Sequence, residues 1–132
     1  QDQKNNRFLP QIIRGCLLDE KFQISAGEQL RDFCYVEDIT RGILKALTIE
    51  EVEGEIINLA SGISITIREI IEEVQTLIGT GVPDFGKIAY REGENMELYA
   101  NIDKAKQLMD WSPKIKLEQG LSQTIDFYRS KI

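Results

Sequence analysis

The chain has no histidine among its 132 residues, and it has only two cysteines, three prolines and one tryptophan. Without imidazole the chain lacks the usual histidine ligand of zinc sites and the histidine base of Ser-His or Cys-His nucleophilic catalysis. Carboxylates, lysine, tyrosine and cysteine are the side chains left to transfer protons. Cys16 and Cys34 each have apolar neighbours, which favours packing over a redox or metal-binding role. We therefore expect no metal site and no catalytic residue of these classes.

Long apolar runs and positive charge are scarce as well. No apolar run approaches the ~20 residues that span a bilayer, and residues 1–6 have no signal-peptide character. The chain has 16 basic and 22 acidic residues, a formal net charge of −6, so it lacks the broad cationic field that attracts nucleic acid or an anionic membrane. We expect a cytoplasmic protein with neither partner. The first residue is glutamine and the apolar pattern begins abruptly at Phe8, which predicts a piece of a longer protein.

The apolar spacing predicts one mixed α/β (α+β) domain over 1–132, with about four short strands and five helices. Helices are expected at 7–19, 37–48, 66–78, 102–109 and 117–130, and strands at 22–26, 31–36, 55–60 and 87–90. The helix at 66–78 has the clearest ends, because Thr66 and Glu69 match a capping box and Gly79 suits a left-handed C-cap. The run at 55–60 is typical of a largely buried strand.

Two sequence motifs of nicotinamide enzymes are missing. The nearest glycine-rich text, residues 79–86, follows a predicted helix instead of a strand and contains Pro83, so it does not match a dinucleotide-binding loop. No tyrosine is followed four residues later by lysine, so a Tyr-x-x-x-Lys base pair is absent as well. The paired glutamates of the chain are interpreted as solvated helix faces and turns.

Three segments, in this order, carry a resemblance. The first is GEQLRDFCYVED at 27–38, the second EIINLASGISIT at 55–66, and the third joins REGE at 91–94 to YANIDKAKQLMDWSP at 99–113. Together they resemble the carboxyl-terminal part of the NAD-dependent epimerase/dehydratase family, the extended short-chain dehydrogenase/reductases that act on nucleotide sugars. The chain departs from the family pattern at Ile24-Ser25, at Glu92 and at Asp110, where many relatives have an aromatic-glycine step, a proline and a glycine.

The resemblance implies that this chain is the substrate-binding part, without the main Rossmann domain. In the family, the glycine loop, the NAD or NADP cofactor and the Tyr/Lys pair belong to the amino-terminal part. This chain is therefore expected to bind a nucleotide diphosphate-sugar, to bind no cofactor itself, and to be inactive alone, because hydride transfer needs both cofactor and base. The alternative is a free-standing, non-catalytic module that binds nucleotide sugar or docks on a protein.

The expected substrate-binding residues follow from the resemblance and from the charge of the ligand. Arg31 and Arg91 match diphosphate or ribose contacts, and an arginine fork suits phosphate well. Glu94 stands where the family has an aspartate that accepts hydrogen bonds from ribose. Asn6 lies at the start of the first helix, whose free amides are suited to phosphate.

Structural roles compete with several of these assignments. Arg31 could form a surface ion pair with Asp32, Asp38 is interpreted as a helix cap, and Trp111 as a core residue. The resemblance also implies that residues 38–60 lie against the cofactor sheet of the missing part. In its absence the strand at 55–60 would have an unpaired edge, which predicts self-association.

Overall fold

The computed structural model describes residues 7–132, which divide into two compact units. The first unit combines the chain up to Gln29 with Thr66–Met96 and Leu121–Ile132, and the second combines Leu30–Ile65 with Glu97–Gly120. The mixed α/β class expected from the sequence is confirmed. That both units fold together as one domain stays a prediction.

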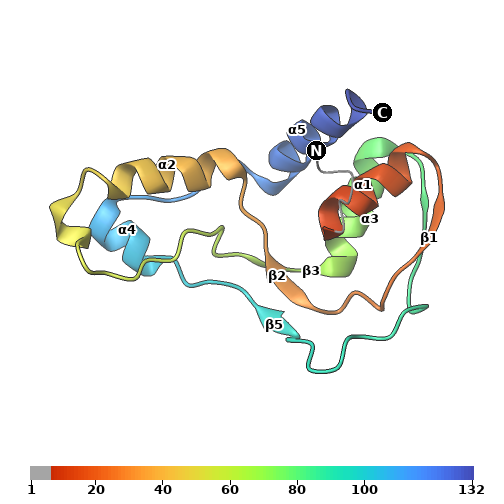
Figure 1. The fold of residues 1–132 in the computed structure, drawn as a ribbon, viewed down its shortest axis with the longest axis horizontal. Helices are drawn as coiled ribbons and strands as arrows, with labels where there is room; N and C mark the ends of the chain where they lie inside the picture. Colours follow the sequence, from red (N-terminus) through yellow and green to blue (C-terminus); the bar gives the residue numbers. More distant parts are fainter. Residues whose placement is uncertain (1–6) are drawn as a thin grey trace. The chain divides into compact units, whose positions relative to one another are not determined.

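Two packed helices form the core of the first unit. Helix α1 (Phe8–Leu17) lies beside α3 (Ile67–Ile78) (Figure 1). Their facing apolar side chains are almost fully buried: Ile12, Ile13, Cys16, Ile70, Ile71 and Val74. Strand β1 (Lys21–Gln23) pairs in parallel with β4 (Val82–Asp84), and α5 (Leu117–Arg129) contributes the buried Leu121 and Ile125.

The ends of α3 match the sequence prediction. The Thr66 hydroxyl accepts a hydrogen bond from the Glu69 amide at 3.1 Å, and the Glu69 carboxylate accepts one from the Thr66 amide at 2.8 Å. These two bonds are the reciprocal capping box. The Glu69 carboxylate accepts hydrogen bonds from both the hydroxyl and the amide of Thr66. These bonds, the one from the hydroxyl having the larger effect, hold the pKa of Glu69 below its usual value. Gly79 ends the helix with φ +86°, a conformation that glycine adopts without strain.

The second unit is built around a three-stranded sheet and a small core. Strand β2 (Leu30–Asp32) lies between β3 (Ser64–Thr66) and β5 (Glu97–Leu98), and the β2–β5 pair is parallel. The other elements are α2 (Val36–Ala46), a short 3₁₀ helix η1 (Glu50–Val52) and α4 (Asp103–Met109). Ala105, Met109 and Trp111 form the buried centre, against which Ile57 and Leu59 pack. Trp111 is thus a core residue, as expected.

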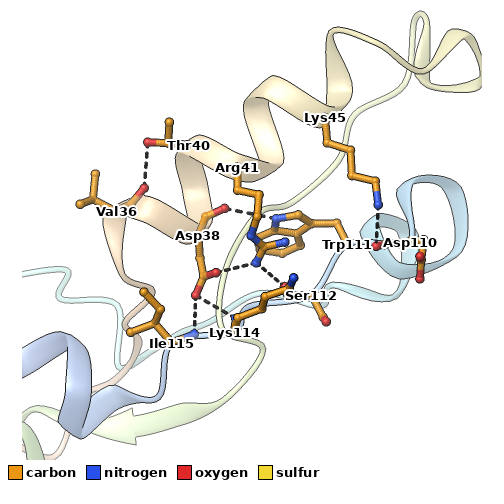
Figure 2. A network of polar contacts seen from close by, with 10 residues as sticks. All are labelled: Val36, Asp38, Thr40, Arg41, Lys45, Asp110, Trp111, Ser112, Lys114 and Ile115. Carbon is orange, nitrogen blue, oxygen red and sulfur yellow. Dashed lines mark hydrogen bonds and ion pairs between the residues drawn. The ribbon is translucent and has the colours of Figure 1, made fainter.

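Asp38 pins the segment after α4 to α2 (Figure 2). Its carboxylate, only 2% exposed, accepts hydrogen bonds from the amides of Lys114 at 2.9 Å and Ile115 at 2.8 Å. It also pairs with Arg41 at 2.5 Å, and its carbonyl accepts from the Trp111 indole. The expectation that Asp38 caps its helix was wrong: Tyr35 is the N-cap and has no side-chain cap bond. The carboxylate serves a distant segment instead.

Two predicted strands do not form. Residues 55–60 belong to no strand within residues 7–132, because a strand needs a hydrogen-bonded neighbour and the described part of the chain offers them none. Residues 87–90 are likewise not a strand. The amides of Lys87 and Ile88 both donate to the carbonyl of Ile24, so the chain turns there. The strand that does pair with β1 is β4, which the sequence analysis missed.

Candidate functional site

Arg91 and Glu94 are brought together on one tight turn in the first unit. The Glu94 amide donates to the Arg91 carbonyl at 3.0 Å, and Gly93 between them has φ +73°. Arg91 is exposed and Glu94 is half-buried. The turn thus offers a guanidinium and a carboxylate three residues apart, on backbone that is fixed by its own hydrogen bond.

Tyr90 attaches this turn to the loop that follows β1. Its hydroxyl accepts a hydrogen bond from the Glu28 amide at 3.1 Å and donates one to the Glu28 carboxylate at 3.2 Å. One side chain therefore joins two loops that are 62 residues apart in the sequence. The sequence analysis did not select Tyr90. The only signal for it was its position directly before Arg91.

A second support of the same loop is Arg68, in the first turn of α3. Its guanidinium donates to the Ala26 carbonyl from Nε at 3.2 Å and from Nη2 at 2.9 Å, and it stacks on the Phe85 ring at 3.8 Å. Gly27, at φ +77°, passes so close that a Cβ there would lie 3.0 Å from the Arg68 backbone nitrogen. Only glycine fits this approach without strain. The loop at 26–28 is therefore held on two sides.

Arg31 lies in the second unit, on the central strand of its sheet. It pairs with Leu98 of β5, is half-buried, and donates from Nη1 to the Leu30 carbonyl at 2.8 Å. The neighbouring Asp32 carboxylate accepts hydrogen bonds from the amides of Ser61 at 2.7 Å and Gly62 at 2.9 Å. Asp32 thus orders the glycine turn at 61–62, a structural role that the sequence did not reveal.

The second unit also contains a small apolar cavity of about 190 Å³. Its lining consists of Phe33, Cys34, Ser61, Ile63, Ile65, Pro113, Lys114, Ile115, Lys116 and Leu117. Burial, and then the nearby charges of Asp38 and Asp32, raise the pKa of Cys34 to about 11. At neutral pH this thiol is protonated, so it is not an activated nucleophile.

The remaining expectations concern the first helix, the glycines and bound groups. Asn6 lies outside the described residues, and α1 begins after Arg7 with no side-chain cap. The glycine-rich segment at 79–86 has a structural role. Gly79 ends α3, and a Cβ on Gly81 would lie only 2.6 Å from Cys16 Cα. This segment does not fit a nicotinamide cofactor. Residues 7–132 contain no cluster of three metal-ligating side chains and no helix of bilayer length.

Comparison with known proteins decides the family. A family model described as GDP-mannose 4,6 dehydratase matches residues 3–124. The chain belongs to this family of NAD-dependent nucleotide-sugar epimerases and dehydratases, in the extended short-chain dehydrogenase/reductase group. A UDP-glucuronate 4-epimerase of Thermodesulfobacterium geofontis is 39% identical over 113 residues, which cover 80% of this chain and 32% of that protein. The resemblance inferred from the three segments is thereby confirmed.

Solved structures of family members share the fold. The UDP-glucose 4-epimerase of Thermotoga maritima with UDP-glucose matches 99% of this chain with a TM-score of 0.88 at 26% identity. The UDP-glucuronic acid 4-epimerase of Bacillus cereus in complex with UDP-glucuronic acid and NAD matches 98% with a TM-score of 0.85 at 29% identity. This chain covers 42% of each of these two chains. It also spans about a third of the length of the curated relatives it matches.

Proposed function

We propose that this chain is the nucleotide-sugar-binding part of a NAD(P)-dependent epimerase, dehydratase or reductase. The observation that carries the proposal is the turn from Arg91 to Glu94, which places an arginine and a glutamate three residues apart on backbone that is held by its own hydrogen bond and by the neighbouring Tyr90. Relatives with this fold have been solved with UDP-glucose or UDP-glucuronic acid bound. A nucleotide diphosphate-sugar presents both groups that such a pair suits, a phosphate and ribose hydroxyls.

The proposed contacts divide by charge. Arg91 and Arg31 are each assigned to the diphosphate or the ribose, because a planar guanidinium can give two parallel hydrogen bonds to phosphate oxygens. Glu94 accepts from the ribose hydroxyls, and Asn6 provides a further contact. Because the chain carries a net charge of −6, its general field repels the ligand and affinity depends on these few cations.

The chemical step is assigned to a cofactor-binding domain that this chain does not contain. NAD or NADP bound there supplies the hydride acceptor, and a base of that domain removes the proton. This chain binds and orients the nucleotide, and it is inactive by itself. With its apolar surfaces uncovered, it is also expected to self-associate.

Calorimetric titration with UDP-, dTDP-, GDP- and CDP-sugars tests the proposal. Arg91→Ala and Arg31→Ala should each weaken binding at least tenfold, which is about 1.4 kcal/mol. Arg14→Ala, at an exposed position of α1, is the matched control and should leave affinity unchanged. If both variants bind as tightly as the unmodified chain, the assigned contacts are wrong.

The second candidate is a free-standing module that binds nucleotide sugar without catalysis. It is supported by the side chains this sequence has, which can bind an anion but do not supply the Tyr-x-x-x-Lys pair. Sequencing the reading frame upstream of Gln1 separates the two candidates. An upstream region encoding a glycine-rich loop supports the enzyme, and a start codon directly before Gln1 supports the module.

A further inference from the structure

The segment that leads into the turn at 91–94 has little regular structure of its own. Residues 85–96 contain no helix or strand. The last backbone hydrogen bonds that tie this segment to the rest of the first unit before the turn are donated by the amides of Lys87 and Ile88. From 89 to 93, no backbone amide donates to a backbone oxygen within the described part of the chain. The placement of the turn therefore depends on side-chain contacts.

Tyr90 provides such a contact one residue before the turn begins. Its hydroxyl forms two hydrogen bonds with a single residue, because it accepts from the Glu28 amide at 3.1 Å and donates to the Glu28 carboxylate at 3.2 Å. A hydroxyl can donate and accept at the same time, whereas the ring of phenylalanine offers neither group. The two bonds fix the tyrosine, and with it the start of the turn, to the loop at 26–28.

This loop is itself held by helix α3. The Arg68 amide donates to the Gly27 carbonyl at 2.9 Å, and the Arg68 guanidinium donates to the Ala26 carbonyl. Arg68 belongs to the first turn of α3, which the capping box stabilises. A continuous series of contacts therefore leads from a well-packed helix through the loop to Tyr90.

We propose that Tyr90 and Glu28 are positioning residues for nucleotide binding: their two hydrogen bonds hold the turn so that Arg91 and Glu94 are already placed for the ligand. The inference rests on the proposed function and assigns part of the affinity to a contact within the protein. A turn that is ordered in advance loses less conformational freedom when the ligand binds, and binding is stronger for that reason. Both hydrogen bonds lie at the surface, so their loss should loosen the turn without unfolding the unit.

Graded variants test the proposal by titration with nucleotide sugar, beginning with UDP-glucose, which is bound in a solved relative. Tyr90→Phe removes both hydrogen bonds and should weaken binding about three- to tenfold. Glu28→Ala removes only the carboxylate acceptor, because the backbone amide remains, and should weaken binding less. Glu28→Gln keeps an acceptor oxygen and should bind like the unmodified chain. In a Tyr90→Phe background, Glu28→Ala should cause no further loss, because the bond it removes is already absent.

Hydrogen exchange of the protein without ligand separates positioning from direct contact with the nucleotide. The Glu94 amide donates to the Arg91 carbonyl across the turn, and in Tyr90→Phe it should exchange at least about threefold faster. The amides of α3 should not change. Tyr128→Phe is the matched control, because Tyr128 is also a half-buried tyrosine of the first unit. It should alter neither the affinity nor the exchange of the Glu94 amide.

Three results would overturn the proposal. The first is unchanged affinity in Tyr90→Phe. The second is weaker binding with unchanged exchange at Glu94, because the hydroxyl would then contact the ligand itself. The third is an equal loss for Glu28→Gln and Glu28→Ala, which would assign the effect to the charge of Glu28 instead of to its hydrogen bond.

Failure of the proposed function would be recognised separately. It fails if the unmodified chain binds none of the four classes of nucleotide sugar. The exchange of the Glu94 amide is measured without ligand, so it still decides whether the Tyr90 hydroxyl orders the turn.

Discussion

Replacement of Asp38 by alanine should destabilise the second unit more than any surface change on the same helix. The carboxylate accepts from two backbone amides and pairs with Arg41, and it is 2% exposed (Figure 2). Alanine removes the acceptors but leaves the donors in place. The free energy of unfolding falls because these donors are then shielded from water without a hydrogen-bond partner.

The size of the loss follows from the number of donors. Each amide left without a partner costs about 1–3 kcal/mol when buried, and the amides of Lys114 and Ile115 are only partly buried, so the lower half of that range applies. Arg41 is about one-third exposed and keeps its bond to the Ser112 carbonyl at 2.7 Å, so it adds little. The expected total is about 2–4 kcal/mol for Asp38→Ala. Asp38→Asn should cost less, because both amides donate to the same oxygen, Oδ2, and asparagine keeps one acceptor oxygen.

Urea unfolding followed by circular dichroism at pH 7 measures these differences. Glu37→Gln is the matched control, because Glu37 is exposed and adjacent to Asp38, and it should change stability by less than about 0.5 kcal/mol. A loss below about 1 kcal/mol for Asp38→Ala would refute the idea that this carboxylate holds the segment at 111–115 against α2.

The effect should also depend on pH in a defined direction. Burial alone raises the pKa of Asp38, but the hydrogen bonds from the Ile115 amide, the Arg41 side chain and the Lys114 amide outweigh it, so the pKa lies below its usual value. A lowered pKa means that the ionised group stabilises the fold fully above its unfolded pKa of about 3.9. That stabilisation is lost as pH falls through the folded value. The gap between the unmodified chain and Asp38→Ala should therefore narrow below about pH 4. A gap that widens would contradict the assignment.

Three further predictions concern local features. Thr66→Ala should lower stability by about 1 kcal/mol, since it removes the N-cap acceptor of α3; a change near zero in urea unfolding would contradict the cap. Asp110 ends α4 with φ +45°, so Asp110→Gly should raise stability by about 0.5–1 kcal/mol by relieving the left-handed strain, and a loss in the same assay would contradict it. Burial raises the pKa of both Cys16 and Cys34 to about 11, so labelling by a thiol reagent at pH 8 should be slow until urea unfolds the chain. Rapid labelling of Cys16 in the native state would show that its burial is wrong.

The candidate site was only partly visible in the sequence. Arg91 and Glu94 could be selected because they stand in a short segment of family type, and their turn is local. Tyr90 and Arg68 could not be selected from the sequence, because each contacts a loop 42 or more residues away. No local sequence pattern encodes such a contact. Asp38 was misassigned for the same reason: its position in the first turn of α2 suits a cap, but its partners are 76 and 77 residues away.

The five helices were determined by the sequence alone, together with the capping box and the glycine stop of α3. Helical hydrogen bonds join residues four apart, so spacing and caps within a dozen residues contain the necessary information. The strands were decided by tertiary structure, because their hydrogen bonds need a partner from elsewhere in the chain. Residues 55–60 show the difference: their side chains alternate as in a strand, yet within the described chain no neighbour completes them. The outward apolar face of α2, on which Ile43, Leu44 and Leu47 are exposed, was likewise decided by the tertiary structure, because only the fold shows which side of an amphipathic helix packs within its own unit.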